Sequence, residues 1–130
     1  MLFRSSWYWN RDADSRAWSR KFFEKFKRMP SSLQAADYSA TLQYLTAVKA
    51  TGSDDADKVL AKLKTMKIND IFTKNGFVRG DGSMIHDMYL MQVKTPDKSV
   101  EPWDYYNVVQ TFKGEEAWTT KADSTCALWK

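Results

Sequence analysis

Large apolar side chains recur at helical spacing through the first half of the chain. Trp18, Phe22 and Phe26 are four residues apart, which predicts one apolar stripe along a helix. Pro30 closes this pattern, because the residue before a proline avoids the helical region. Two similar patterns follow, and Gly52 between them is typical of the left-handed residue just past a helix end. The predicted helices span residues 14–28, 32–50 and 54–67.

The second predicted helix is apolar on almost every side. Its Ala, Leu, Tyr and Val residues leave hardly any polar face, and such a helix is expected to be buried. A chain of 130 residues rarely buries one helix completely, so the pattern indicates a packing surface supplied by further polypeptide. The predicted core side chains are Trp18, Phe22, Phe26, Leu42, Leu45 and Leu63.

After residue 67 the apolar period changes from helical to extended. Turn signals at Asn75-Gly76 and Gly80-Asp81-Gly82 separate short alternating segments. Residues 1–9 also resemble the inside of a strand, whereas residues 116–130 form an irregular tail. The predicted strands cover residues 77–79, 84–94 and 103–112. Helices and strands in this arrangement predict an α/β fold.

Composition narrows the class of protein. The chain has 130 residues, 43% hydrophobic and 28% charged, as expected for one globular domain. No stretch approaches the roughly 18 uncharged apolar residues of a membrane-spanning helix. A single cysteine and a single histidine exclude an internal disulfide framework and a cysteine-based zinc site. We therefore expect neither a metal site nor a cofactor.

Positive charge is concentrated near the N-terminus. The net charge is +4, and residues 1–30 hold eight basic and three acidic side chains. A basic, aromatic segment is compatible with a nucleic-acid-binding module, whose affinity would fall steeply with added salt. We favour the alternative, a helix with a solvated basic face and no nucleic-acid partner.

Candidate catalytic groups are few. His86 precedes Asp87 directly, so on a strand the two side chains would point to opposite faces rather than form an acid–base pair. Cys126 lies in the irregular tail, where nothing indicates a lowered thiol pKa. Gly80–Ser83 lacks the Gly-Lys-Ser/Thr ending of a phosphate loop. The residues therefore predict a binding or structural unit rather than an enzyme.

Short motifs in a specific order provide the strongest clue. They are Gln34-Ala35-Ala36-Asp37-Tyr38-Ser39-Ala40-Thr41-Leu42, Tyr44-Leu45, Ala47-Val48, Gly52, Asp54-Asp55-Ala56, Phe77-Val78-Arg79, Asp81-Gly82, His86-Asp87-Met88-Tyr89-Leu90, Trp103-Asp104-Tyr105-Tyr106 and Glu116-Ala117. In this order they resemble the type I periplasmic substrate-binding proteins of ABC importers. Within that group they are most similar to the branched-chain amino acid (Leu/Ile/Val) type.

This resemblance implies the C-terminal third of a two-lobed protein with Rossmann-like lobes and three hinge crossovers. Residues 7–89 would belong to the first lobe, and residues 90–130 to the end of the second lobe and the tail. Crossovers are expected near residues 5–7 and 88–90. The chain has no recognisable signal peptide, and the resemblance implies that the full-length protein is periplasmic and monomeric.

The resemblance also implies a function. The full-length protein would capture an amino acid, amide or similar small solute between its lobes and deliver it to a membrane permease. Leu33 and Gln34 match positions that look into the cleft, and Tyr38 lies one turn further on. Core packing is an open alternative for Leu33 and Tyr38. Trp7 and Tyr8, at the expected hinge, are interpreted as packing residues rather than ligand contacts.

An exported protein also places Cys126 in an environment where thiols tend to pair. The implied partner is a cysteine in the N-terminal two-thirds of the full-length protein, and the bond would stabilise the fold by roughly 2–4 kcal/mol. The alternative is a thiol that stays unpaired in every form. Thiol titration of the unfolded full-length protein, with and without reductant, distinguishes the two.

Overall fold

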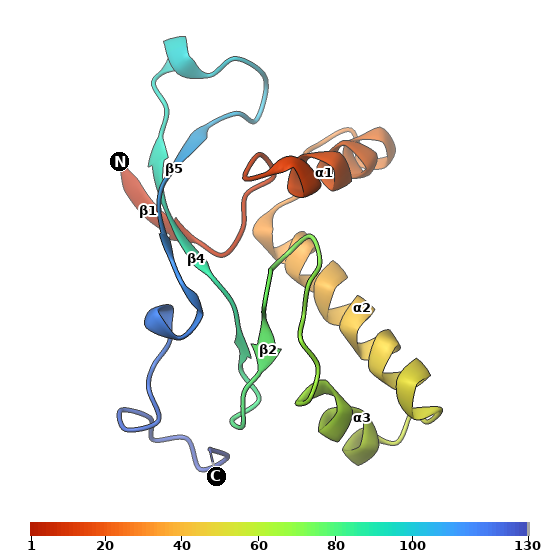
Figure 1. The fold of residues 1–130 in the computed structure, drawn as a ribbon. Coiled ribbons are helices and arrows are strands. Elements are labelled where there is room, and N and C mark those ends of the chain that lie inside the picture. The colour runs from red at the N-terminus through yellow and green to blue at the C-terminus, as the bar shows by residue number, and fades with distance from the viewer. Residues whose placement is uncertain (130) are drawn as a thin grey trace.

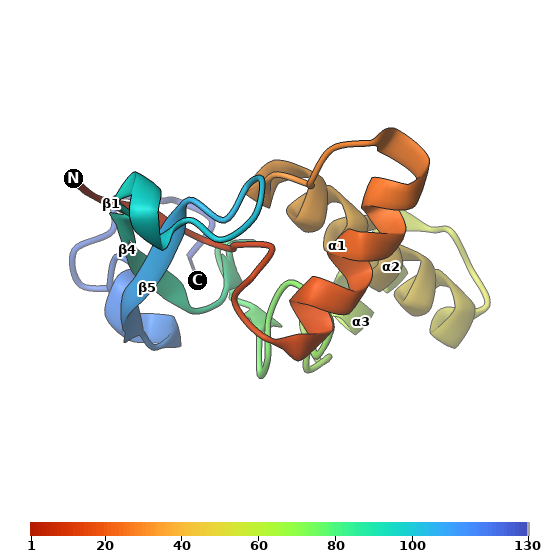
Figure 2. The ribbon, with the colours of Figure 1, turned by 90° about the horizontal axis from the view of Figure 1, so that it is seen from above.

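The computed structural model describes residues 1–129 as a sheet on one side and a group of helices on the other (Figure 1). The view from above shows the same separation, with β1, β4 and β5 beside one another and α1, α2 and α3 together (Figure 2). The elements are β1 (Leu2–Ser5), α1 (Ala13–Phe26), α2 (Ser32–Thr51), α3 (Ala56–Leu63), β2 (Phe77–Val78), β3 (Met84–Ile85), β4 (Met88–Val93) and β5 (Tyr106–Phe112), with short 3₁₀ turns at Pro96–Lys98 and Gly114–Ala117.

The three predicted helices are present; α2 differs from its prediction by one residue, α1 ends two residues early, and α3 is shorter at both ends. Asp12 begins α1 by accepting a hydrogen bond from the amide of Ser15, and Lys27 ends it in the left-handed conformation. Helix α3 ends at Leu63, four residues before the predicted limit. The reason is tertiary: Ile68 pairs with Gly76 in an isolated antiparallel bridge, which requires extended backbone just after the helix.

The sheet is antiparallel, with strand order β1-β4-β5. Leu2 pairs with Gln92 at one end of the β1–β4 ladder, and the β4–β5 register shifts between Leu90 and Met91. The predicted strand over residues 84–94 is in fact two strands. It is interrupted at residues 86–87, and β3 pairs with β2 in a separate hairpin. Strand β5 begins at Tyr106 rather than at residue 103, because Asp104 is drawn into a buried ion pair.

The core lies where the sheet meets the helices. Trp7, Tyr8 and Trp9 leave the end of β1 and are almost fully buried. They pack with Phe72 and with Met91 of β4. The indole of Trp7 also donates to the carbonyl of Ile71 at 2.8 Å, which satisfies its buried polar group. Remaining members of the buried cluster are Ala35 and Tyr89.

The predicted burial of the helices is only partly observed. Trp18, Phe22 and Leu63 are half-buried, but Phe26 is 57% exposed, Leu42 38% and Leu45 56%. The prediction is therefore wrong for these last three residues within residues 1–129. These side chains are exposed because α2 packs against its neighbours through the face that carries its small residues. Its larger side chains lie on the other faces of the helix. The buried residues of α2 are Ala35, Ser39 and Ala47.

The basic side chains of the first helical segment lie on the surface. All are exposed, as predicted; they are Arg16, Arg20, Lys21, Lys25, Lys27 and Arg28. Arg20 pairs with Glu101 at 3.1 Å, which links α1 to the β4–β5 connection. Among residues 1–129, every helix is too short or too polar to cross a membrane.

Candidate functional site

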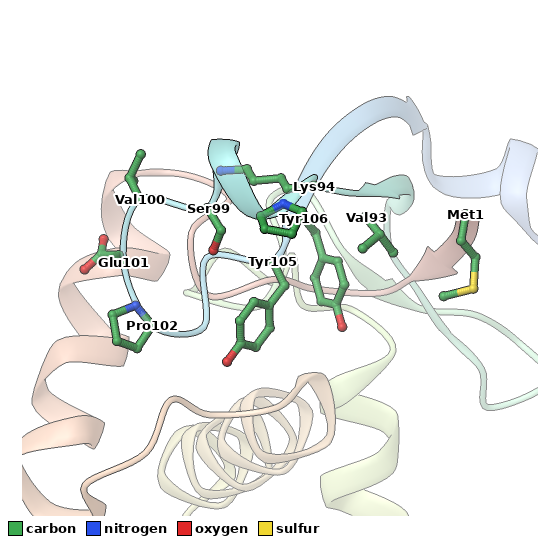
Figure 3. Close-up of a pocket in the computed structure, with 10 residues that line it drawn as sticks. Met1, Val93, Lys94, Ser99, Val100, Glu101, Pro102, Tyr105 and Tyr106 are labelled. Carbon is green, nitrogen blue, oxygen red and sulfur yellow. The ribbon is translucent and has the colours of Figure 1, made fainter.

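Two adjoining hollows open beside the β4–β5 connection. The smaller, of about 370 Å³, lies between the sheet and the start of α2, and we call it the crossover cleft. The larger, an open groove of about 810 Å³, follows residues 93–106 on the outside of the connection. Tyr105 and Tyr106 line both hollows. In the close-up view their side chains extend toward the same side of the ribbon (Figure 3). The crossover cleft is lined by Phe3, Ser5, Trp7, Tyr8, Trp9, Met29, Pro30, Ser31, Ser32, Met91, Trp103, Tyr105 and Tyr106.

The sheet-side wall of the crossover cleft is an aromatic layer held by hydrogen bonds. The hydroxyl of Tyr8 donates to the carbonyl of Trp103 at 3.0 Å, and the indole of Trp9 donates to the same oxygen at 2.8 Å. Burial raises the pKa of Tyr8, so its hydroxyl remains a donor at neutral pH. Trp103 itself has φ +67°, in the left-handed region that a bulky residue rarely adopts. The two hydrogen bonds hold Trp103 in that conformation.

A buried ion pair with Lys94 holds Asp104, the residue that follows Trp103. Asp104 is 1% exposed, and its two carboxylate oxygens accept hydrogen bonds from Lys94 at 2.7 and 2.6 Å. Asn10 donates to the same carboxylate at 3.2 Å. The bonds from Lys94 hold the pKa of Asp104 below its usual range, against the opposing effect of burial. Hydrogen bonds therefore join residues 7–10 to residues 103–106 in one continuous wall.

The opposite wall is the first turn of α2. Ser31 and Gln34 form a capping box, in which the Ser31 hydroxyl accepts from the amide of Gln34 and the Gln34 side chain accepts from the amide of Ser31. Within residues 1–129 the amides of Ser32 and Leu33 have no hydrogen-bond acceptor. They add to the positive end of the helix dipole, which favours an anionic group nearby.

The predicted ligand contacts lie just beyond this wall. Leu33 is 75% exposed, the side chain of Gln34 is engaged in the capping box, and Tyr38 packs its ring 5.2 Å from that of Trp18. The structure therefore places all three in the first two turns of α2, but none lines the crossover cleft. The neighbouring Ser31 and Ser32 line it instead.

Sequence reasoning did not single out Trp103 and Tyr105 as site residues. Their signal is the aromatic run from Trp103 to Tyr106, which predicts a strand and belongs to the family motifs, without indicating a role in the site. The structure shows that the run instead joins the loop to the strand, with Trp103 in the cleft wall and Tyr105 47% exposed.

The other candidate groups of the sequence do not form a chemical site. His86 packs between the rings of Phe72 and Trp118, at 5.0 and 5.1 Å between centroids, and its Nδ1 lies 2.8 Å from the carbonyl of Asp87. Cys126 is exposed and free within residues 1–129. Over the same residues no group of three or more His, Cys, Asp or Glu side chains is placed to hold a metal ion.

Comparison with known proteins identifies the class to which this fold and cleft belong. A sequence model described as periplasmic binding protein matches residues 1–99. The chain therefore belongs to the periplasmic binding protein family, whose members are non-enzymatic components of transport, and this membership confirms that it is not an enzyme. No curated protein matches the chain.

Solved structures give the same result in three dimensions. The chain is 62% identical to a periplasmic binding protein from Burkholderia mallei, with a TM-score of 0.97 over 100% of this chain and 34% of that one. It is 44% identical to a branched chain amino acid ABC transporter periplasmic ligand-binding protein from Burkholderia xenovorans, with a TM-score of 0.95 over 99% of this chain and 34% of that one. An amino acid ABC transporter substrate-binding protein from Pseudomonas fluorescens shares the fold, at 21% identity and a TM-score of 0.77 over 86% of this chain and 30% of that one.

These matches also show how much of a periplasmic binding protein the chain covers. It spans about a third of the length of the Burkholderia structures. The α/β arrangement of residues 1–129 therefore matches part of a periplasmic binding protein rather than a whole one.

Proposed function

We propose that this chain is the C-terminal third of a solute-binding protein of an ABC importer, of type I and of the branched-chain amino acid type. The full-length protein captures an amino acid, an amide or a similar small solute between two lobes and delivers it to a membrane permease. Family membership and the 44% identical ABC transporter ligand-binding protein support this function and a periplasmic location. In this proposal the protein acts as a monomer and needs no cofactor.

The single observation that carries the proposal is the crossover cleft. Its two walls come from different parts of the chain, one attached to the sheet and the other to α2. We assign residues 7–89 to the first lobe and residues 90–130 to the second lobe and tail, with crossovers near residues 5–7 and 88–90. In this assignment Ser31 and Ser32 line the cleft from the first lobe, whereas Trp103 and Tyr105 line it from the second. A solute in the cleft therefore contacts both lobes at once and stabilises the closed form.

The chemistry of the cleft suits an amphipathic solute. The sheet-side wall is aromatic, and the α2 wall presents the hydroxyls of Ser31 and Ser32 and the unpaired amide of Ser32. An aromatic surface packs on an aliphatic side chain, and a helix N-terminus binds a carboxylate. An amino acid combines these two features in one small molecule.

Leu33, Gln34 and Tyr38 remain proposed ligand contacts on the α2 side. Leu33 and Tyr38 are 75% and 42% exposed in this chain, so their side chains are free to meet a solute or further polypeptide. Gln34 contributes indirectly as well, because its capping bond holds the first turn of α2 in place.

The test is a thermal-shift screen of the full-length protein against amino acids and amides, followed by calorimetric titration of the best solute. Binding raises the melting temperature because the solute binds only the folded protein. We expect Tyr105→Ala to weaken the affinity about tenfold, a loss of about 1.4 kcal/mol. Tyr44→Ala is the matched control, since Tyr44 is 46% exposed, Tyr105 is 47% exposed, and Tyr44 lies outside the cleft. A protein that responds to no solute, or equal affinities for the two variants, would contradict the proposed site.

A further inference from the structure

The C-terminal tail does not continue along the sheet. After β5 the chain turns at Gly114–Ala117, and the segment that follows runs back to the β2–β3 hairpin (Figure 1). Residues that come after the last strand of the sheet therefore contact a hairpin that precedes β4. We call residues 113–129 the tail segment.

The first anchor of the tail segment is Arg79, in the β2–β3 hairpin. Its guanidinium lies 3.7 Å from the centre of the Trp129 ring and donates to the carbonyl of Thr119 at 3.0 Å. Asp81 holds the same guanidinium from the other side through two hydrogen bonds, of 3.1 and 2.7 Å. The Arg79 side chain is only 13% exposed, so the stack with Trp129 is partly desolvated and correspondingly stronger.

The charge state of this anchor is constant under physiological conditions. The hydrogen bonds from Arg79 lower the pKa of Asp81 to about 2, so the carboxylate stays ionised well below neutral pH. Asp81 thus keeps the Arg79 fork in one orientation, with its face turned to Trp129.

The second anchor is Trp118, which reaches the segment between the hairpin and β4. Its indole donates to the carbonyl of His86 at 3.0 Å, and its ring lies edge-on to the imidazole at 5.1 Å. His86 in turn packs against Phe72, which is 4% exposed. This row of three rings connects the tail segment to the buried core.

A third contact lies at the beginning of the tail segment. Asp87 accepts hydrogen bonds from the Lys113 ammonium at 2.7 Å and from the amide of Gly114 at 2.9 Å. The three contact points Arg79, His86 and Asp87 all precede β4, whereas the tail segment follows β5.

From these contacts we propose that the tail segment is a strap that spans the crossover near residues 88–90 and limits how far the two lobes open. The proposal rests on the two-lobed function given above. Arg79, His86 and Asp87 belong to the first-lobe side of that crossover, and the tail segment is carried by β5 on the second-lobe side. The Asp87 contact lies at the crossover itself, next to the Met88–Phe112 pair. Opening would pull Arg79 and His86 away from the end of β5, so the contacts of Trp129 and Trp118 oppose it.

The test measures the distance between the two sides in the full-length protein. Spin labels are attached to Ala61→Cys on α3 and Gln110→Cys on β5, both exposed positions, in a background where Cys126 and every other cysteine of the full-length protein are replaced by serine. The double variant Trp118→Leu/Trp129→Ala removes both ring anchors. We expect its solute-free distance distribution to shift to longer values and broaden. Leu128→Ala is the control, because Leu128 is 71% exposed in the same segment, and it should keep the original distribution.

Two single variants keep the test decisive if the double variant does not fold. Trp129→Ala removes only the surface stack on Arg79 and should lengthen the distances partially, whereas Trp129→Phe retains a ring face and should restore them. A distribution identical to the original in Trp129→Ala, and in the double variant where it folds, would overturn the strap.

The solute separates failure of the strap from failure of the proposed function. If solute narrows the distribution in every variant but the solute-free distributions are all alike, the strap is wrong and the solute-binding function stands. If no solute changes the original protein but the double variant is still longer, the strap stands and the solute-binding function is wrong.

Discussion

Charged residues with low exposure determine the position of the β4–β5 connection. Asp104 accepts hydrogen bonds from Lys94 beyond the end of β4, from Asn10 before α1 and from the amide of Val100 within the connection. The connection carries Trp103 and Tyr105, so the Asp104 carboxylate positions the aromatic wall without touching the cleft itself. An unpaired charge at this site would be costly, because a buried ion needs its partners.

We expect Asp104→Asn to destabilise the full-length protein by about 3 kcal/mol, since it leaves the Lys94 ammonium without its partner. The pH dependence has a defined sign. The folded pKa of Asp104 is lowered, so its contribution is complete above the unfolded value of about 3.9 and is lost as pH falls through the folded pKa. Denaturant unfolding between pH 3 and pH 7 measures both effects. If the variant and the original protein lose the same stability as the pH falls over this range, Asp104 is not the group responsible.

At the scale of elements, the helix ends determine where the cleft lies. The capping box at Ser31 fixes the first turn of α2, and the left-handed residue Lys27 turns the chain from α1 into that cap. Lys27 has φ 57°, a conformation that costs a side chain about 1 kcal/mol or more and that glycine adopts freely. The path between α1 and α2 is thus held by packing despite an unfavourable residue.

We expect Lys27→Gly to stabilise the protein by about 0.5 kcal/mol, because relief of the left-handed strain exceeds the extra entropy of the unfolded chain. Lys25→Gly is the matched control, since Lys25 is also exposed but lies inside α1, where glycine costs about 1 kcal/mol. Opposite shifts in the denaturant midpoint would support this interpretation. A decrease for both variants would show that the Lys27 side chain itself makes a stabilising contact.

For the whole molecule, the exposed apolar side chains of α2 have a consistent explanation. Leu42 and Leu45 are 38% and 56% exposed in a chain that spans about a third of its solved relatives. In the full-length protein we expect Leu45 to be covered, and Leu45→Ala to cost about 2–3 kcal/mol. Val100→Ala, at a position 83% exposed on the β4–β5 connection, is the control and should be nearly neutral. Equal, small effects in denaturant unfolding would show that this face of α2 stays in solvent.

The basic surface of α1 is also a property of the whole molecule. Its Lys and Arg side chains are exposed, and Arg20 already pairs with Glu101. We expect only weak, non-specific binding of duplex DNA in a filter assay at moderate salt. Tight binding that falls by several decades on modest addition of salt would instead support the nucleic-acid-binding alternative.

The sequence was sufficient for local structure. Helical spacing of Trp18, Phe22 and Phe26, the boundary residues Pro30 and Gly52, and the turn glycines depend on neighbours in the chain, and the helices and hairpin appear where these signals predict them. The ordered motifs also indicated the family that the comparisons show. The helix and turn signals depend only on residues close together in the sequence, so one sequence is enough to detect them.

Burial and the shape of the cleft were decided only by the tertiary structure. Helix α2 contacts its neighbours through Ala35, Ser39 and Ala47, so its large side chains are exposed although their pattern predicted a buried helix. Trp103 is held in the left-handed region by the side chains of Tyr8 and Trp9, more than ninety positions earlier in the chain. Periodicity shows which side chains share a face, but it does not show what covers that face. That depends on long-range contacts and on polypeptide outside these residues.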